Sequence, residues 1–299
     1  LRTRASMDLA AAHLGAHAVT LTPGSGTWGL ETRDGVTMDG AAAEHVREAF
    51  GVRSRYADAL GVRTFATLSD YDADQEDRAF RAVVAASSVP VINLESARWH
   101  PCQELGDAAA VTDLLAAPRG QQRGLSWAPH PKPLPRAVPN SALLMAARLG
   151  MEVIVARPDG FGRGTDVLDL ARQVASRTGG SITESADQEA ALAGARIVYA
   201  KSWSGSAVYD NPDLEATQRA ANASWRITPG DMTRTDRAHF MHCLPVRRGV
   251  VGDGDVLDDD RAAHLLQAEY RLHAQKAILE WVWDVEGSGV EVHGSSAPA

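Results

Sequence analysis

The sequence predicts an α/β fold with two domains, in which parallel sheets are flanked by helices. A chain of 299 residues with 44% hydrophobic residues is long enough for two domains, each with its own core. In the second half, short apolar runs alternate with helical patterns, which is typical of βαβ units and a doubly wound parallel sheet. The stretch Pro118–Arg123, rich in proline, arginine, glycine and glutamine, indicates the boundary between the domains.

The first domain, expected over residues 1–117, alternates helical and strand patterns. An Ala-rich helical segment, Ala5–Leu14, is closed by Gly15, a residue type that commonly ends helices. The Gly-rich loop after it carries Trp28, an aromatic side chain of the kind that buries against its own domain, a ligand or a neighbouring subunit. The other expected elements are strand His17–Leu21, a helix through Glu44, Val46, Phe50 and Tyr56, strand Leu60–Phe65, strand Val89–Leu94, and a helix from Pro101 to about Ala116.

The second domain, expected over residues 118–266, has a clearer strand–helix rhythm. Its expected elements are strand Gly124–Ala128, a helix after Pro139–Ser141, strand Glu152–Ala156, a helix near Asp166–Arg177, strand Ile197–Ala200, an apolar strand-like run beginning at His239, and then a closing helix over about Ala268–Trp283. The tail, 287–299, is rich in glycine, serine, proline and alanine, a composition that predicts disorder.

Composition excludes several classes of function. With 38 acidic and 30 basic residues the net charge is −8, which argues against a general surface for nucleic acid or anionic membranes, so any anion site must be local. The absence of a membrane-length apolar run and of a signal-peptide pattern makes the cytoplasm the expected location. Only Cys102 and Cys243 are present, with no zinc-ligand spacing, and no dinucleotide or Walker motif occurs; we expect neither a metal nor a cofactor.

A candidate site lies where the strand-like run His239–Arg248 ends. There the chain presents the thiol of Cys243, the backbone carbonyl of Leu244 before a proline, and the guanidinium of Arg247. Because ligands of open α/β sheets bind at the carboxyl ends of strands, these groups are well placed for a binding site. A buried strand followed by a basic surface turn explains the same residues.

Other chemistry-bearing residues also follow strands or begin helices. Arg2 and Thr3 lie in the first turn of a helix, where cations are unfavourable unless an anion is bound, although a frayed helix end is an alternative. Arg63 ends a strand, and His100 and Gln103 flank a proline that suits a first helical turn. His130, in the proline-rich segment 129–136, and Lys201, after Tyr199, follow further strands; surface or structural roles are the common alternatives.

Three motifs in this order resemble the aspartate/ornithine carbamoyltransferases. They are Leu1–Arg4 (LRTR), His100–Gln103 (HPCQ) and His242–Pro245 (HCLP), and together they span nearly the whole chain. The resemblance implies that family's two-domain fold, with a closing helix, 267–286, that packs back on the first domain. The family's first helix and strand, and the serine before the LRTR-like stretch, have no counterpart here, so we expect the first domain to lack them and the chain to be poorly active.

The segment Tyr199–Trp203 (YAKSW) refines this resemblance. Ornithine carbamoyltransferases carry an aspartate at the position of Lys201, where it holds the free α-amine of ornithine. A lysine cannot accept a hydrogen bond from an ammonium, but it suits a carboxylate whose neighbouring amine is acylated. With Met38–Gly40 (MDG), Trp28 and Tyr270–Lys276 (YRLHAQK), the chain resembles the N-acetylornithine and N-succinylornithine carbamoyltransferases of arginine biosynthesis.

The resemblance implies roles for individual residues in a homotrimer. The expected catalytic residues are His100, Arg63, Gln103, Cys243 and Leu244. The expected carbamoyl phosphate site contains Arg2, Thr3, Trp28 from a neighbouring subunit, Arg63, His100, Gln103, Cys243, Leu244 and Arg271. The expected acylornithine site contains Glu95, His130, Lys201, Leu244 and Arg247.

The acyl group depends on two further positions. Acetyl-specific relatives carry a glutamate at the position of Ala43 and a modified lysine at the position of Val251. Since a glutamate would repel the free carboxylate of a succinyl group, Ala43 favours N-succinylornithine, and Arg247 with His130 would supply a cation. The alternatives are an N-acetylornithine enzyme, an ordinary ornithine carbamoyltransferase, which Lys201 disfavours, and an inactive homologue that only binds ligands.

Overall fold

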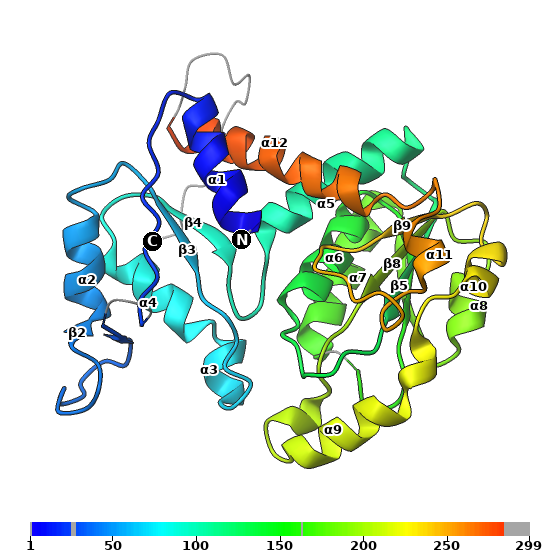
Figure 1. Ribbon diagram of the computed structural model, residues 1–299, viewed down its shortest axis with the longest axis horizontal. Helices are drawn as coiled ribbons and strands as arrows, with labels where there is room; N and C mark the ends of the chain where they lie inside the picture. The colour runs from blue at the N-terminus through cyan, green and yellow to red at the C-terminus, as the bar shows by residue number, and fades with distance from the viewer. Residues whose placement is uncertain (1, 25–27, 163, 284–299) are drawn as a thin grey trace.

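The computed structural model describes residues 2–24, 28–162 and 164–283. The two halves of the chain form two lobes, and α12 (His264–Val282), the last helix of the described residues, runs from one to the other (Figure 1). The predicted α/β fold with parallel sheets is confirmed. The predicted disordered tail, 287–299, lies outside the described residues. No helix in the described part of the chain is long and apolar enough to cross a membrane.

The second lobe is built on a five-stranded parallel sheet with the strand order β7-β6-β5-β8-β9. Its strands are β5 (Gln122–Trp127), β6 (Glu152–Ala156), β7 (Ser181–Ser185), β8 (Ile197–Lys201) and β9 (His239–Met241). Ser126 pairs with Ala156 on one side and with Ala200 on the other, so the carboxyl ends of these strands meet at one edge. That edge faces the first lobe's site residues and carries Lys201.

Helices cover both faces of this sheet. They are α6 (Ala137–Arg148), α7 (Thr165–Thr178), α8 (Gln188–Leu192), α9 (Pro212–Ala221), α10 (Pro229–Thr233) and α11 (Gly254–Leu257), with the short 3-10 helices η1 (Ser206–Val208) and η2 (Ala223–Trp225). The core beneath α6 and α7 includes Trp127, whose ring centroid lies 4.7 Å from that of Phe161. Trp127 Nε1 donates to the Trp203 carbonyl oxygen at 2.9 Å, which fixes the segment directly after Lys201.

The first lobe has less sheet. Strand β3 (Leu60–Arg63) pairs in parallel with β4 (Val91–Glu95), and β1 (Leu30–Glu31) pairs in parallel with β2 (Glu44–His45). Its helices are α1 (Arg2–His13), α2 (Val46–Arg53), α3 (Tyr71–Gln75), α4 (Arg78–Ala86) and α5 (Pro101–Leu115). Strands β3 and β4 end on Arg63 and Glu95, which are paired across the two strands and therefore lie side by side.

Two predictions for this lobe are wrong. Residues His17–Leu21 form no strand, and Val19 and Leu21 are 74% and 57% exposed. An apolar pattern makes a strand only where a neighbouring strand pairs with its backbone groups, and none of the described strands does so. The helix expected to pass through Glu44 begins only at Val46, because Glu44 and His45 pair with β1 and the His45 side chain caps α2.

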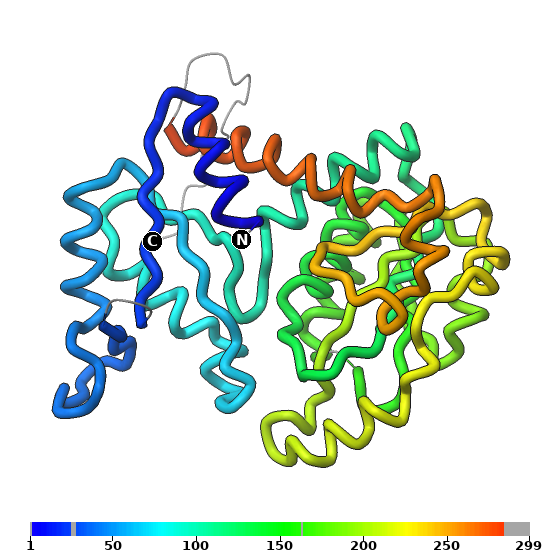
Figure 2. Tube along the Cα trace, in the orientation of Figure 1, coloured from blue at the N-terminus to red at the C-terminus, as the bar shows by residue number. Residues whose placement is uncertain are grey.

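Helix α12 joins the lobes by packing along α5 and against α1 (Figures 1 and 2). A Cβ atom on Gly106 of α5 would lie only 3.2 Å from the Cα atom of Arg271. Glycine therefore permits the two helix backbones to approach closely at this point. The result is that Arg271, near the end of the chain, lies beside residues from its beginning.

Candidate active site

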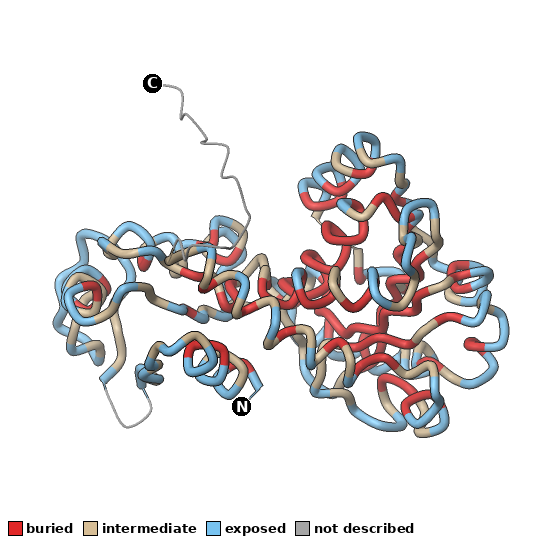
Figure 3. The backbone as a smooth tube through the Cα atoms, turned by 90° about the horizontal axis from the view of Figure 1, so that it is seen from above, coloured by how far each residue is buried: buried red, intermediate tan, exposed pale blue. Residues whose placement is uncertain are grey.

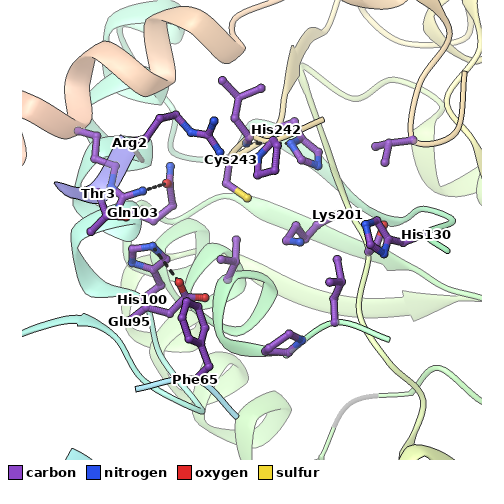
Figure 4. Close-up of a pocket in the computed structure, with 18 of the residues that line it drawn as sticks. Arg2, Thr3, Phe65, Glu95, His100, Gln103, His130, Lys201, His242 and Cys243 are labelled. Carbon is purple, nitrogen blue, oxygen red and sulfur yellow. Dashed lines mark hydrogen bonds and ion pairs between the residues drawn. The ribbon is translucent and has the colours of Figure 1, made fainter. Parts of the chain in front are cut away.

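A cavity of about 250 Å³ lies between the lobes and collects most of the residues that the sequence predicted for the site (Figure 4). The predicted residues that line it are Arg2, Thr3, Arg63, Glu95, His100, Gln103, His130, Lys201, Cys243, Leu244 and Arg271. They come from the start of α1, the ends of β3, β4, β8 and β9, the start of α5, the 129–136 segment and α12. Residues at the carboxyl ends of strands from both lobes therefore meet in this cavity.

One side of the cavity is formed by Thr3, Arg63, Gln103 and Arg271, which we call the arginine wall. The hydroxyl oxygen of Thr3 accepts hydrogen bonds from Arg63 Nη1 at 2.9 Å and from Arg271 Nη2 at 3.0 Å. Arg271 Nη1 also donates to Gln103 Oε1 at 3.2 Å. Guanidinium groups beside the N-terminus of α1 create a strong positive potential suited to a phosphate.

Glu95 and His100 lie next to this wall. The Glu95 carboxylate accepts from Arg63 Nε at 2.9 Å and pairs also with Arg63 Nη2, while His100 Nε2 lies 3.7 Å from Glu95 Oε2 (Figure 4). Burial, together with the nearby Arg271 and Arg63, holds the pKa of His100 well below its ordinary value. The imidazole is therefore neutral at physiological pH and presents one N–H donor.

The end of β9 supplies a backbone acceptor. Leu244 has a φ of +56° and precedes a cis peptide bond to Pro245, and its N–H donates to His242 Nδ1 at 2.9 Å. No described residue donates a hydrogen bond to the Leu244 carbonyl. Burial raises the pKa of the Cys243 thiol, so that the sulfur stays protonated. This segment offers the cavity a carbonyl oxygen and an uncharged thiol.

His130 and Lys201 line the opposite side of the cavity, and Arg247 contacts His130; we call these three residues the lysine wall. Arg247 Nε donates to His130 Nε2 at 3.0 Å, and Arg247 itself is exposed and does not line the cavity. Burial lowers the pKa of His130, and Arg247 and Lys201 lower it further. The ammonium of Lys201 forms no hydrogen bond or ion pair with any other described residue. Two cations of this wall are thus left without a carboxylate.

Trp28 and Ala43 lie away from the cavity of their own chain. Trp28 is 57% exposed and donates from Nε1 to Glu44 Oε2 at 2.8 Å, which places it beside Ala43. Ala43 is exposed as well. Neither residue contacts the site within this chain, so any role in binding requires a neighbouring subunit.

Several residues that line the cavity were not among the predicted site residues. They are Phe65, Leu134, Pro135, Val138 and Ser202, together with His242 and Pro245, which belong to the HCLP motif without an assigned role, and Val251, which stands where acetyl-specific relatives carry a lysine. Most are apolar, and the sequence around them does not distinguish a residue that lines a cavity from one that fills a core. Phe65 offered one signal, since it follows a strand that ends on Arg63, and its ring lies 4.5 Å from the Arg63 guanidinium carbon.

The match to known families covers both lobes. The carbamoyl-P binding domain of the aspartate/ornithine carbamoyltransferases matches residues 1–113, and the Asp/Orn binding domain matches residues 136–282. The chain belongs to the aspartate/ornithine carbamoyltransferase family. Membership of this enzyme family accounts for an arginine-rich anion site on one lobe facing a second binding surface on the other.

Individual relatives are similar over most of their length. The N-acetylornithine carbamoyltransferase of Xanthomonas campestris pv. campestris is 40% identical over 93% of this chain and 83% of its own. The N-succinylornithine carbamoyltransferase of Bacteroides thetaiotaomicron is 34% identical over 94% of this chain and 83% of its own. A solved acetylornithine transcarbamylase complexed with acetylcitrulline has a TM-score of 0.92 at 40% identity, covering 94% of this chain and 85% of that one.

A further solved structure bears on the acyl group. It is a glutamate-to-alanine variant of N-acetyl-L-ornithine transcarbamylase, complexed with carbamyl phosphate and N-succinyl-L-norvaline. It has a TM-score of 0.92 at 40% identity and is matched over 94% of this chain and 86% of its own.

Proposed function

We propose that this protein transfers the carbamoyl group of carbamoyl phosphate to the δ-amine of an N-acyl-L-ornithine, giving N-acyl-L-citrulline and phosphate in arginine biosynthesis. The observation that carries the proposal is the pairing of two walls across one cavity. The arginine wall suits a phosphate, and the lysine wall offers Lys201 where an enzyme for free ornithine needs an acceptor for an ammonium. The relatives named for acylated ornithine agree with this choice.

Carbamoyl phosphate would bind against the arginine wall. Its phosphate would accept hydrogen bonds from Arg2, Arg63, Arg271 and the amides at the start of α1. Its carbamoyl group would lie between His100 and Gln103, which line the cavity near these arginines. The site needs no metal for this, because the phosphate charge is balanced by guanidinium groups.

Carbamoyl transfer would then proceed by direct attack. The neutral δ-amine, oriented by the Leu244 carbonyl and the Cys243 thiol, attacks the carbamoyl carbon, and an oxyanion develops on the carbamoyl oxygen. Neutral His100 and the Arg63 guanidinium donate to that oxygen. As the C–N bond forms, the C–O bond to phosphate breaks, the amine gives up one proton to the departing phosphate, and the arginine wall holds the phosphate charge. The lobes hold both reactants in one orientation, which lowers the entropic part of the barrier.

The acylornithine would lie against the lysine wall. Lys201 would pair with its α-carboxylate, and Glu95, His130, Leu244 and Arg247 would complete its site. Acylation makes the α-nitrogen an uncharged amide, so no carboxylate is required at the position of Lys201.

We favour an N-succinyl over an N-acetyl group. A succinyl group brings a second carboxylate, and the lysine wall holds a second cation, Arg247, that has no carboxylate partner among the described residues. Ala43 adds no opposing charge. The variant relative that binds N-succinyl-L-norvaline has likewise lost a glutamate. Ala43 would act from a neighbouring subunit together with Trp28, which requires an oligomer such as the trimer implied by the resemblance.

One assay tests the proposal. Citrulline-type product is measured from carbamoyl phosphate with free, N-acetyl and N-succinyl ornithine as separate acceptors. We expect the order succinyl, then acetyl, then free ornithine. Preference for acetylornithine, which the 40% identical relative's name favours, would correct the acyl group only. Preference for free ornithine would refute the role of Lys201, and no product with any acceptor would identify an inactive homologue.

A further inference from the structure

A buried polar cluster lies behind the arginine wall and is centred on Asp107. Asp107 of α5 is 1% exposed and does not line the cavity. A carboxylate buried this deeply is costly unless its oxygens accept hydrogen bonds. Asp107 Oδ1 accepts from Gln103 Nε2 at 2.7 Å and from Gln267 Nε2 at 2.6 Å. One carboxylate oxygen therefore holds two amide side chains, one from α5 and one from α12.

These contacts permit only one orientation of the Gln103 amide. A carboxylate oxygen mainly accepts hydrogen bonds, and a guanidinium only donates them. Asp107 lies on one side of the amide, and Arg271, which lines the cavity, donates to Gln103 Oε1 from the other. A flipped amide would place Oε1 against the carboxylate and the NH₂ group against Arg271. Gln103 is thus fixed with its carbonyl oxygen, and not its NH₂ group, on the side of the cavity.

The same carboxylate also positions the end of β9. Gln267, which is fully buried, accepts at Oε1 from the backbone N–H of His242 at 3.0 Å, and its Nε2 lies 3.1 Å from the Tyr199 hydroxyl oxygen. Arg123, also fully buried, stacks its guanidinium carbon 4.5 Å from the Tyr199 ring centroid, and its guanidinium has no hydrogen-bond partner among the described residues. A positive charge without a partner next to this cluster favours an acceptor at Asp107.

We propose that Asp107 is a positioning residue that makes Gln103 an obligate hydrogen-bond acceptor toward the cavity, and that this is how the site selects a carbamoyl over an acetyl group. This inference rests on the proposed function. A carbamoyl NH₂ group donates to Gln103 Oε1. The methyl group of acetyl phosphate has about the same size but no donor, so Gln103 Oε1 would keep only its hydrogen bond from Arg271, and its acceptor site toward the cavity would stay unfilled. If the amide were free to flip, Gln103 would not discriminate between the two.

The test compares the dissociation constants of carbamoyl phosphate and acetyl phosphate. They are measured by calorimetry on the wild type, Asp107→Asn, Asp107→Ala and the control Glu104→Gln. Glu104 is a second buried carboxylate of α5, whose side chain pairs with Arg148 and forms no hydrogen bond with the Gln103 side chain. We expect the wild type and Glu104→Gln to prefer carbamoyl phosphate by about tenfold or more, the value of one hydrogen bond to a buried acceptor. Asp107→Asn retains an acceptor oxygen and should keep most of that preference.

Asp107→Ala should lose the preference, mainly by weakening carbamoyl phosphate binding. If Asp107→Ala does not fold, Asp107→Ser replaces it, because the serine hydroxyl is one bond shorter than the carboxylate and leaves a smaller hole. An equal loss of affinity for both ligands in the Ala or Ser variant would show a merely structural role and overturn the inference, as would a wild type that binds both equally. A wild type that binds neither phosphate would instead overturn the proposed function.

Discussion

The two walls of the cavity differ in how far their polar groups are engaged before any ligand is present. On the arginine wall, Thr3, Arg63, Gln103 and Arg271 are hydrogen-bonded to one another, and Asp107 supports them from behind. On the lysine wall, Lys201 contacts no polar partner among the described residues. Arg247 contacts only His130 there. One wall is pre-ordered and the other is open.

The difference suggests separate tasks for the two walls. Pre-ordered donors lose little entropy when they bind a ligand, and they are suited to a charge that develops during reaction. Open cations can meet carboxylates at different positions, which suits the part of the substrate that varies between relatives. We therefore expect changes on the arginine wall to affect turnover of every acceptor, and changes on the lysine wall to affect the choice of acceptor.

The largest effect is expected from Arg271→Ala and Arg63→Ala. Each removes charge-assisted hydrogen bonds worth roughly 1.5–3 kcal/mol, so kcat/KM for carbamoyl phosphate should fall at least about tenfold with every acceptor. Steady-state kinetics measure this, and the far-UV circular dichroism spectrum checks that the fold is intact. Arg172→Ala, which removes an exposed arginine of α7, is the control. Unchanged kinetics in both site variants would show that the arginine wall does not bind carbamoyl phosphate.

Lys201→Met should act on the acceptor alone. Loss of an ion pair with the α-carboxylate should raise KM for acylornithine about tenfold, while the dissociation constant of carbamoyl phosphate changes little. Methionine keeps the length of the side chain in a position that is 8% exposed. If carbamoyl phosphate binding weakens as much as acylornithine binding, the two walls are not independent.

The stability of the protein should fall as the pH drops below about 6.5, the pKa of histidine in an unfolded chain. The pKa of His100 is lowered in the folded state by burial, and then by Arg271 and Arg63, so the unfolded chain takes up the proton first. Below pH 6.5, this histidine therefore costs up to about 1.4 kcal/mol of stability per pH unit until its own pKa is reached.

Urea denaturation at pH 7.5 and 5.5 measures this effect. His100→Gln should reduce the loss of stability on acidification by about 1 kcal/mol. The matched variant on the lysine wall, His130→Gln, should reduce it less, because the pKa of His130 is lowered to a smaller extent. Equal effects of the two variants would contradict the contrast in burial between the walls.

The smallest effect is expected from Ala43→Glu. A glutamate contributed by a neighbouring subunit should repel the succinyl carboxylate and weaken N-succinylornithine use by about 1 kcal/mol, or roughly fivefold, with little change for N-acetylornithine. The ratio of kcat/KM for the two acceptors measures it, and Asp58→Ala on the same lobe is a surface control. Full succinylornithine activity in Ala43→Glu would contradict the repulsion and the proposed position of Ala43 in the assembly.

A residue's role could be predicted from the sequence where it depends on residues nearby in the chain, and not where it depends on contacts with distant residues. Lys201 and Arg63 were identifiable because they end apolar strands, whose carboxyl ends meet at one edge in a parallel sheet. Arg271 came only from the family resemblance, since nothing in the pattern of a helix states which distant residues it meets. The sequence did not predict a role for Asp107, because the residues around it come partly from distant elements, Gln267 from α12 and Arg123 from β5.

The failures have the same physical origin. His17–Leu21 has the apolar pattern of a strand, but pairing depends on a partner that lies elsewhere in the chain. Leu134 and Val138 line the cavity with apolar side chains of the kind that also fill cores. Many segments of the second lobe are buried, as Figure 3 shows. Local sequence reports on local conformation, whereas exposure to a cavity is decided by how the two lobes meet.

The hydrogen bond from Arg271 to Thr3 joins residues 268 positions apart. Bringing the ends of so long a flexible segment together costs about 5 kcal/mol of chain entropy, far more than one hydrogen bond returns. The packing of α12 along α5 and α1 must therefore close that loop. The arginine wall therefore cannot assemble on the ribosome before α12 has been synthesised. We expect a nascent chain to bind carbamoyl phosphate only after nearly all of the described residues have been synthesised and have folded.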